Sequence, residues 1–257
     1  MILAFDIGNS AVKGALYDGD KCVQRMHFSS EEIYSPTGIV DGLKLALDDR
    51  SVDAVGCVSV VPVLTDRVQM AVQIVLGLGL NNMDVNTPNP LSVEYETPLT
   101  LGADRLAAVT AAYLMYGKDT AGPARPVIVV DAGTAVTCDF VSADGVYSGG
   151  TITAGPQLVR DALHTSTAQL PNVDLQLPDS LPARSTNEAV QAGVMYGFLD
   201  ATSGMIGRLK KAASGDVVVV ATGGWATWLA QHCYEVDLGD PDLVLHGVRF
   251  LLEYAEK

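Results

Sequence analysis

Two short segments, residues 5–13 and 130–137, share the order apolar residue, aspartate, any residue, glycine, then a hydroxyl or amide. Glycine lets a backbone N–H approach a phosphate oxygen without a Cβ in the way, and the aspartate can hold a cation. Two such turns predict a clamp for a polyphosphate, although either turn alone also serves simply to close a strand. The residues concerned are Asp6, Gly8, Asn9, Ser10, Asp131, Gly133 and Thr134.

Two further features could meet a nucleotide. Lys13 follows the first turn and could reach phosphate or remain a solvated strand lysine. The segment Thr222, Gly223 and Gly224 joins a run of valines to a helix, and a nucleotide can rest on the exposed backbone of such a turn. Trp225 and Trp228 just beyond could stack on a base, but their spacing on a short helix is more typical of a core.

Asp104 and Arg105 begin an apolar helix and are its only charged residues before Lys118. An acid in this place also complements the helix N-terminus, so capping alone could explain Asp104. A carboxylate base beside a guanidinium is, however, what the phosphorylation of a hydroxyl on an acidic substrate requires. The pair is therefore a candidate catalytic site.

Ser185 and Glu188 have the spacing of a capping box at the start of the longest expected helix. Capping explains both residues. It leaves Thr186 with a hydroxyl at a helix N-terminus, where it could touch a ligand.

The elements that must position these residues alternate along the chain. Short apolar runs predict strands at residues 2–5, 54–61, 127–130 and 217–221. Helical patterns occupy residues 38–47, 66–76, 102–116, 155–163, 185–213, 224–232 and 241–255. This alternation predicts an α/β fold.

Each Asp-x-Gly turn closes one strand and opens another, which then runs to a turn at Asp18-Gly19 or Asp144-Gly145. Two such hairpins indicate a duplicated domain. We expect one domain over residues 1–117 and a second over 118–257, with a hinge in the Gly- and Pro-containing segment 117–126. The final helix could pack back on the first domain.

The amino-acid composition limits the kinds of function that the chain can have. The chain of 257 residues is 48% hydrophobic and 18% charged, so it can bury a sizeable core. Its net charge of −14 disfavours nonspecific binding to nucleic acid. No apolar stretch is long enough to span a bilayer, we expect no secretory signal, and four scattered cysteines favour a reducing cytoplasm.

The sequence lacks the motifs that mark several common kinds of nucleotide, metal and catalytic site. The chain contains no GxxxxGK[ST] P-loop and no GxGxxG after its first strand. The four histidines have no spacing suited to a metal, and no Ser-His-Asp arrangement can be argued from their order.

Taken together, the motifs resemble those of the type III pantothenate kinases, within the acetate and sugar kinase, Hsp70 and actin superfamily. Ser59 to Pro62, Tyr95 followed by Gly102 to Arg105, and Gly149-Gly150 leading to Thr167 to Pro171 add to the resemblance, which spans the chain. Ser10 stands where the family usually has threonine, and Ala154 precedes Gly155 where proline is usual. Neither departure removes a functional group.

The resemblance implies two similar ribonuclease H-like, actin-like ATPase domains with a cleft between them. It also implies ATP-dependent phosphorylation of the primary hydroxyl of pantothenate, the first step of coenzyme A synthesis, with Mg²⁺ and a monovalent cation, K⁺ or NH₄⁺. Asp104 would be the general base, Asp131 would hold the monovalent cation and Asp6 the Mg²⁺ that accompanies ATP. Pantothenate would be bound by Tyr95, Gly102, Ala103, Arg105 and Thr186. ATP would be bound by Asp6, Ile7, Gly8, Asn9, Ser10, Ala11, Val12, Lys13, Gly133, Thr134, Thr222, Gly223 and Gly224.

The resemblance also implies a homodimer. The helix that begins at Asp104 is apolar on every side and must be covered by the second domain or by a second subunit. Two alternatives stay open: another small-molecule kinase or phosphatase of the superfamily, and an ATP-binding accessory or regulatory protein without catalysis.

Overall fold

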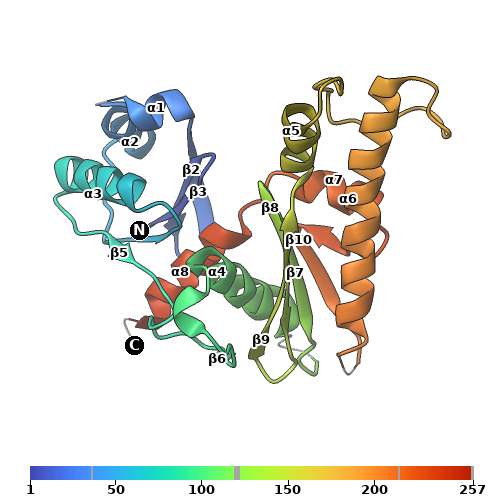
Figure 1. Ribbon diagram of the computed structural model, residues 1–257. Coiled ribbons are helices and arrows are strands. Elements are labelled where there is room, and N and C mark those ends of the chain that lie inside the picture. The colour runs from blue at the N-terminus through green and yellow to red at the C-terminus, as the bar shows by residue number, and fades with distance from the viewer. Residues whose placement is uncertain (36, 119–121, 214, 256–257) are drawn as a thin grey trace. The chain divides into compact units, whose positions relative to one another are not determined.

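The computed structural model describes residues 1–35, 37–118, 122–213 and 215–255 (Figure 1). The chain divides into two compact units. Unit 1 comprises residues 1–114 and 242–257, and unit 2 comprises residues 115–241. The final helix therefore belongs to unit 1. Of the expected hinge at 117–126, residues 119–121 lie outside the described part of the chain.

A mixed sheet forms the centre of unit 1. Its described strands follow the order β3 (Lys21–Phe28), β2 (Val12–Asp18), β1 (Ile2–Ile7), β4 (Ala54–Ser59) and β5 (Asn81–Asn82). β2 is antiparallel to both β1 and β3, whereas β4 is parallel to both β1 and β5. The hairpin expected at the first Asp-x-Gly turn is thus confirmed.

Helices cover both faces of this sheet. Leu3, Phe5 and Ile7 of β1 share one core with α1 (Ser30–Tyr34), α2 (Gly38–Leu47) and α3 (Pro62–Leu76). On the other face, Val248 and Leu252 of α8 (Leu243–Ala255) lie against β4 at Gly56. Alternate strand residues project to opposite faces, so β1 is enclosed between the two helix groups.

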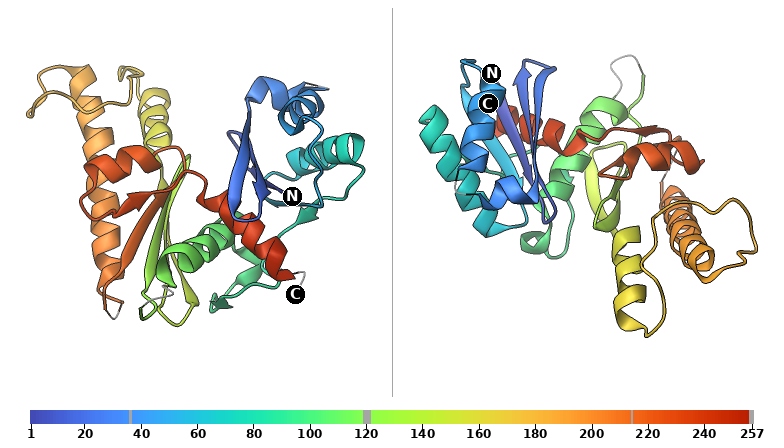
Figure 2. Two further views of the ribbon diagram at one scale, coloured as in Figure 1. Left: turned by 180° about the vertical axis from the view of Figure 1, so that it is seen from behind. Right: turned by 90° about the horizontal axis from the view of Figure 1, so that it is seen from above.

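The helix α4 (Ala103–Ala112) packs directly on α8, as both views in Figure 2 show. A Cβ on Gly247 would collide with the carbonyl oxygen of Ala107, so glycine is what lets the two backbones touch. The expected helix over 102–116 ends as an α-helix at Ala112 and continues as a π-helical turn, Tyr113–Gly117.

Unit 2 repeats the topology of unit 1. Its described strands lie in the order β11 (Leu238–Gly239), β10 (Val218–Thr222), β7 (Val127–Ala132), β8 (Ala135–Val141) and β9 (Val146–Ala154). β7 is antiparallel to β8 and parallel to β10, as β1 is to β2 and β4. The α/β class and the duplication are therefore confirmed.

The helices of unit 2 are α5 (Pro156–Ser166), α6 (Thr186–Lys210) and α7 (Ala226–His232). Ile206 and Leu229 pack against Ile128 and Val130 in the core of this unit. Two short elements of unit 1 complete the description: β6 (Ser92–Val93) and a 3₁₀ turn, Pro98–Thr100. None of the described helices is long and apolar enough to cross a membrane.

Candidate functional site

The predicted site residues divide between the two units. Unit 1 holds the first Asp-x-Gly turn, Lys13, Tyr95 and the start of α4. Unit 2 holds the second turn, Thr186 and the segment 222–224.

Asp6 lies close enough to Lys13 and to Asp104 for the charge of each to act on it. Lys13 is the register partner of Asp6 across β1 and β2, so both side chains project from the same face. Burial raises the pKa of Asp6 to about 6; the charge of Lys13 opposes this rise and that of Asp104 adds to it. The expected phosphate turn and the expected base therefore belong to one electrostatic cluster.

Asp104 lies in the first turn of α4, where Gly102 is the N-cap residue. The backbone N–H of Arg105 donates to Asp104 Oδ1 at 2.8 Å. A Cβ on Gly102 would collide with the same carboxylate oxygen. Gly102 is thus required for the position of Asp104, which gives this glycine a role that its turn propensity alone does not explain.

Arg105 and Tyr95 are brought together, as their shared expected role requires. The guanidinium carbon of Arg105 lies 5.8 Å from the centre of the Tyr95 ring, within cation–π range. Arg105 is buried, with 7% of its surface exposed, on a helix whose residues 105–112 are all buried. Tyr95 is half-buried and presents an aromatic surface beside this fixed charge.

In each Asp-x-Gly turn the glycine N–H bonds to a backbone carbonyl of its own hairpin, three residues ahead in the first turn and two residues ahead in the second. The N–H of Gly8 donates to Ala11 O at 3.0 Å, and that of Gly133 donates to Ala135 O at 2.9 Å. Both glycine N–H groups therefore donate hydrogen bonds inside their own hairpins.

The surrounding protein atoms leave room for a side chain at both Gly8 and Gly133. A Cβ on Gly8 would lie 3.5 Å from Ala11 O, and one on Gly133 would lie 3.8 Å from Ala135 O, both ordinary contacts. Among the described residues, no other atom beyond the chain neighbours would come within 4 Å of either Cβ. The glycines therefore leave room of the kind that a closely approaching ligand needs.

In unit 2 the second turn and the segment 222–224 are packed together. Thr222 is the register partner of Asp131, and a Cβ on Gly223 would lie 2.5 Å from Asp131 Oδ1. Gly223 also has a positive φ of 84°. Gly155, which the sequence did not single out as a site residue, packs on the backbone of Gly133, and its N–H donates to Thr134 O at 2.9 Å.

Thr186 is the first residue of α6 and is exposed. The expected cap is confirmed, because the N–H of Glu188 donates to Ser185 Oγ at 3.3 Å. Glu188 itself accepts from the N–H of Arg184, one residue before the expected partner. The Thr186 hydroxyl is accordingly available beside the helix N-terminus.

The tryptophans after the segment 222–224 belong to the core. Trp225 and Trp228 pack against Phe198, with ring centres 6.0 and 5.7 Å away. The indole N–H of Trp225 donates to Gln157 Oε1 at 2.9 Å. Both rings are half-buried and pack against the core of unit 2, as their spacing predicts.

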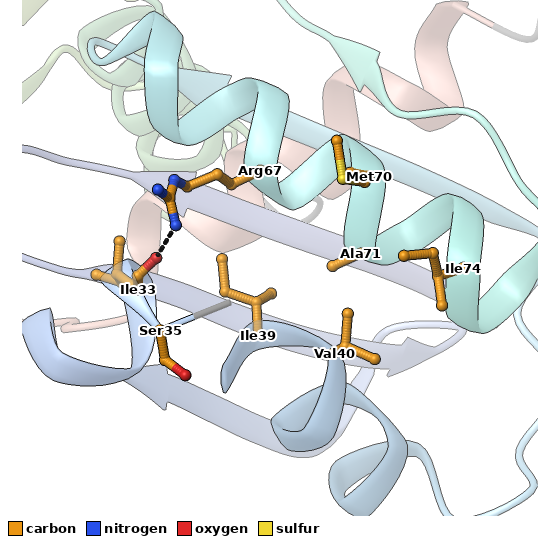
Figure 3. A pocket seen from close by; sticks show the side chains of 8 residues that line it. All are labelled: Ile33, Ser35, Ile39, Val40, Arg67, Met70, Ala71 and Ile74. Atoms are coloured by element: carbon orange, nitrogen blue, oxygen red, sulfur yellow. Dashed lines mark hydrogen bonds between the residues drawn. The ribbon is translucent and has the colours of Figure 1, made fainter. Parts of the chain in front are cut away.

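A pocket of about 340 Å³ lies elsewhere in unit 1, between α2 and α3 (Figure 3). Its walls are mainly apolar, from Ile39, Val40 and Met70 among others, and Arg67 at one end donates to Ile33 O at 3.2 Å. It contains none of the predicted site residues and no carboxylate, so it offers no acid–base chemistry.

The chain matches the family model described as type III pantothenate kinase over residues 2–208. It is 36% identical to type III pantothenate kinase 1 of Symbiobacterium thermophilum, over 98% of this chain and 96% of that one. It is 34% identical to a type III pantothenate kinase of Thermus thermophilus, over 96% and 97% of the two chains.

Solved structures share the fold at lower identity. A conserved Baf family protein of Campylobacter jejuni, described as a transcriptional activator, superposes with a TM-score of 0.58 at 22% identity, covering 98% of this chain and 97% of that one. The ROK hexokinase of Thermus thermophilus gives a TM-score of 0.52 at 14% identity, covering 98% and 99%. These likenesses show that the two solved structures share the α/β fold of this chain.

The raised pKa of Asp6 predicts a pH-dependent gain in stability for Asp6→Asn. The carboxyl titrates near 3.8 when unfolded and near 6 when folded, so its ionisation opposes folding above about pH 6 and has no effect below about 3.8. In metal-free protein at about pH 7.5, Asp6→Asn should raise the free energy of unfolding by up to about 3 kcal/mol. Urea denaturation at several pH values measures this gain.

The gain should shrink as the pH falls from about 7.5 to about 4, because wild-type Asp6 then becomes neutral as well. The matched control is Asp18→Asn, at an exposed carboxylate at the end of β2. A gain that is absent at neutral pH, or that is the same at both ends of the range, contradicts the account.

Proposed function

The chain belongs to the type III pantothenate kinase family, whose reaction is the ATP-dependent phosphorylation of pantothenate in coenzyme A synthesis, and we propose how its residues divide this work. The observation that carries the proposal is the cluster of Asp104, Asp6 and Lys13 in unit 1, with Gly102 shaped to admit the Asp104 carboxylate. If the Asp104 carboxylate served only as a helix cap, it would need neither Asp6 nor Lys13 near it.

Asp104 acts as the general base that accepts the proton of the pantothenate hydroxyl. Arg105 binds the pantothenate carboxylate, because a planar guanidinium matches a carboxylate and a buried one is already held in place. Tyr95, Gly102 and Ala103 lie at the same end of α4, and the family resemblance also assigns Thr186 of unit 2 to pantothenate. The support is the contact between Tyr95 and Arg105.

The residues assigned to ATP form a separate set in each unit. Residues 6–13, including Ile7, Ala11 and Val12, surround phosphates through the first turn, and Gly133 with Thr134 does so through the second. The segment 222–224 receives the adenosine on its backbone. The support is the open space at Gly8 and Gly133, where a side chain would fit but none is present.

The donor sets suit the cations of the proposal. Mg²⁺ is usually held by one or two carboxylates together with substrate phosphates, and Asp6 beside Asp104 fits that need. Among the described residues no group of three or more His, Cys, Asp or Glu could hold a metal unaided. When bound, Mg²⁺ neutralises the phosphate charge that develops during transfer. Asp131 offers a carboxylate to a monovalent cation in unit 2.

Phosphoryl transfer needs little covalent chemistry from the protein, and its catalysis is mostly positioning and charge neutralisation. The chain supplies Lys13 near the phosphates, Asp104 at the acceptor hydroxyl and Arg105 at the far end of the acceptor. We also place the protein in a reducing cytoplasm, which its four free cysteines suit.

A homodimer is part of the proposal and rests on the family resemblance. The apolar α4 no longer argues for it, because residues 105–112 are already buried within one chain and α8 covers part of them. Sedimentation equilibrium at micromolar concentration should give twice the chain mass of 27.0 kDa. A fully active monomer would end this part of the proposal.

Replacing Asp104 by asparagine should lower kcat with pantothenate by about 10² to 10⁴, the range for loss of a positioned general base, while the Kd for ATP stays near that of wild type. Gly102→Ala should lower kcat by about 10², because its Cβ displaces the same carboxylate. Steady-state kinetics and ATP titration measure both effects.

Gly193→Ala, at an open position on α6, is the control for a glycine-to-alanine change. Wild-type turnover in Asp104→Asn would mean that Asp104 is only a helix cap.

Gly8→Ala should fold as stably as wild type, to within about 0.5 kcal/mol, because its Cβ meets only an ordinary contact with the protein. Its Kd for ATP should rise by about tenfold or more, since the methyl group occupies the space needed by phosphate. Gly155→Ala is the contrasting variant: its Cβ collides with Gly133, so it should lose stability. If Gly8→Ala binds ATP like wild type, the first turn does not hold the phosphates.

A further inference from the structure

Two buried hydroxyls in unit 2 have no hydrogen-bond partner among the described residues. They are Oγ1 of Thr222, a residue with 0% of its surface exposed, and Oγ1 of Thr137. A buried polar group left unsatisfied costs about 1–3 kcal/mol, so each such group in a native protein calls for an explanation.

The two hydroxyl residues flank Asp131. Thr222 is its register partner on β10, and Thr137 is its register partner on β8. Residues paired across neighbouring strands project from the same face of a sheet, so the three side chains form one row. The backbone at Gly223 lies against Asp131 Oδ1, which places the carboxylate toward the end of β10.

The equivalent row in unit 1 is built differently. Asp6 pairs with Lys13 on β2 and with Val58 on β4, the strands that correspond to β8 and β10. There the ammonium group of Lys13 favours the ionised carboxylate of Asp6. In the second copy the lysine position is taken by Thr137 and the valine position by Thr222, so an amine has been replaced by oxygen ligands.

We propose that the hydroxyls of Thr222 and Thr137 join the Asp131 carboxylate as ligands of a monovalent cation, K⁺ or NH₄⁺, which takes the electrostatic place that Lys13 occupies in unit 1. The inference rests on the proposed function only in taking Asp131 as the cation site. A hydroxyl oxygen offers lone pairs to a cation, and K⁺ is commonly held by neutral oxygens. One carboxylate with two neutral ligands matches a single positive charge, whereas Ca²⁺ sites gather several carboxylates.

The experiment measures cation binding without turnover. Thermal unfolding of the full chain is followed without ATP or pantothenate, in about 0.1 M KCl and in choline chloride of equal ionic strength. For a site of about 10 mM affinity, K⁺ should raise the wild-type Tm by about 3 °C. Thr222→Val and Thr137→Val should each lose most of this rise, and Thr222→Ser should keep it.

In choline chloride, the effect of the same valine substitutions on stability should have the opposite sign. Removing an unpartnered buried hydroxyl should leave Thr222→Val at least as stable as wild type when no K⁺ is present, which also shows that the variant folds. Thr110→Val is the control, because the buried Thr110 hydroxyl already donates to Leu106 O at 2.8 Å. That variant should be less stable in both salts and keep its response to K⁺.

Two results overturn the inference: a wild-type Tm that does not respond to K⁺, or a response that persists in both valine variants, which would assign the hydroxyls to an ordered water. Pantothenate phosphorylation by the wild type is measured in parallel. If that activity is present while the valine variants still respond to K⁺, only this inference fails. If the activity is absent but the K⁺ response depends on the two hydroxyls, the proposed function fails and the cation site stands.

Discussion

The close contact between α4 and α8 is the constraint on which the chemistry of unit 1 depends. Gly247 lets the two helix backbones touch, and α8 also packs on the strands β1 and β4. One helix from the end of the chain therefore fixes α4, which begins the turn carrying Asp104, relative to the strand that carries Asp6. A larger residue at 247 would have to move α4, and Asp104 with it, because close-packed helices have no spare volume.

The same strand topology appears in both units, but the residues beside the equivalent aspartate differ. In each unit an aspartate near the end of the first strand is flanked by one residue of an antiparallel neighbour and one residue of a parallel neighbour. Lysine and valine flank the aspartate in unit 1, and two threonines flank it in unit 2. The fold thus supplies the position of a carboxylate in each unit, and the residues that flank it differ between the two units.

Local pattern was enough to predict much of the architecture. The apolar spacing over residues 38–47 predicts α2 with the bounds observed, and the turn residues after Phe5 and Val130 predict both hairpins. The start of α3 was placed at Asp66, yet the helix begins at Pro62, because proline is well suited to the first turn of a helix. β3 was missed, since its sequence is largely polar and only Met26 and Phe28 are buried.

What sequence could not supply is proximity between distant segments. Nothing local to Asp104 shows that its charge will act on Asp6, and nothing local to Thr137 shows that its hydroxyl will be buried without a partner. Both facts arise from tertiary packing and strand register. The resemblance of the motifs to a known family indicated the chemistry. The tertiary packing shows which of the motif residues lie close together within a unit.

The most direct test of the central claim is a phosphoryl-transfer assay with wild-type protein, Mg-ATP and a panel of small hydroxyl compounds that includes pantothenate, sugars and acetate. The account predicts that ADP forms in step with phosphopantothenate and that the other compounds are poor acceptors. Rapid phosphorylation of a sugar or of acetate, with none of pantothenate, would contradict it.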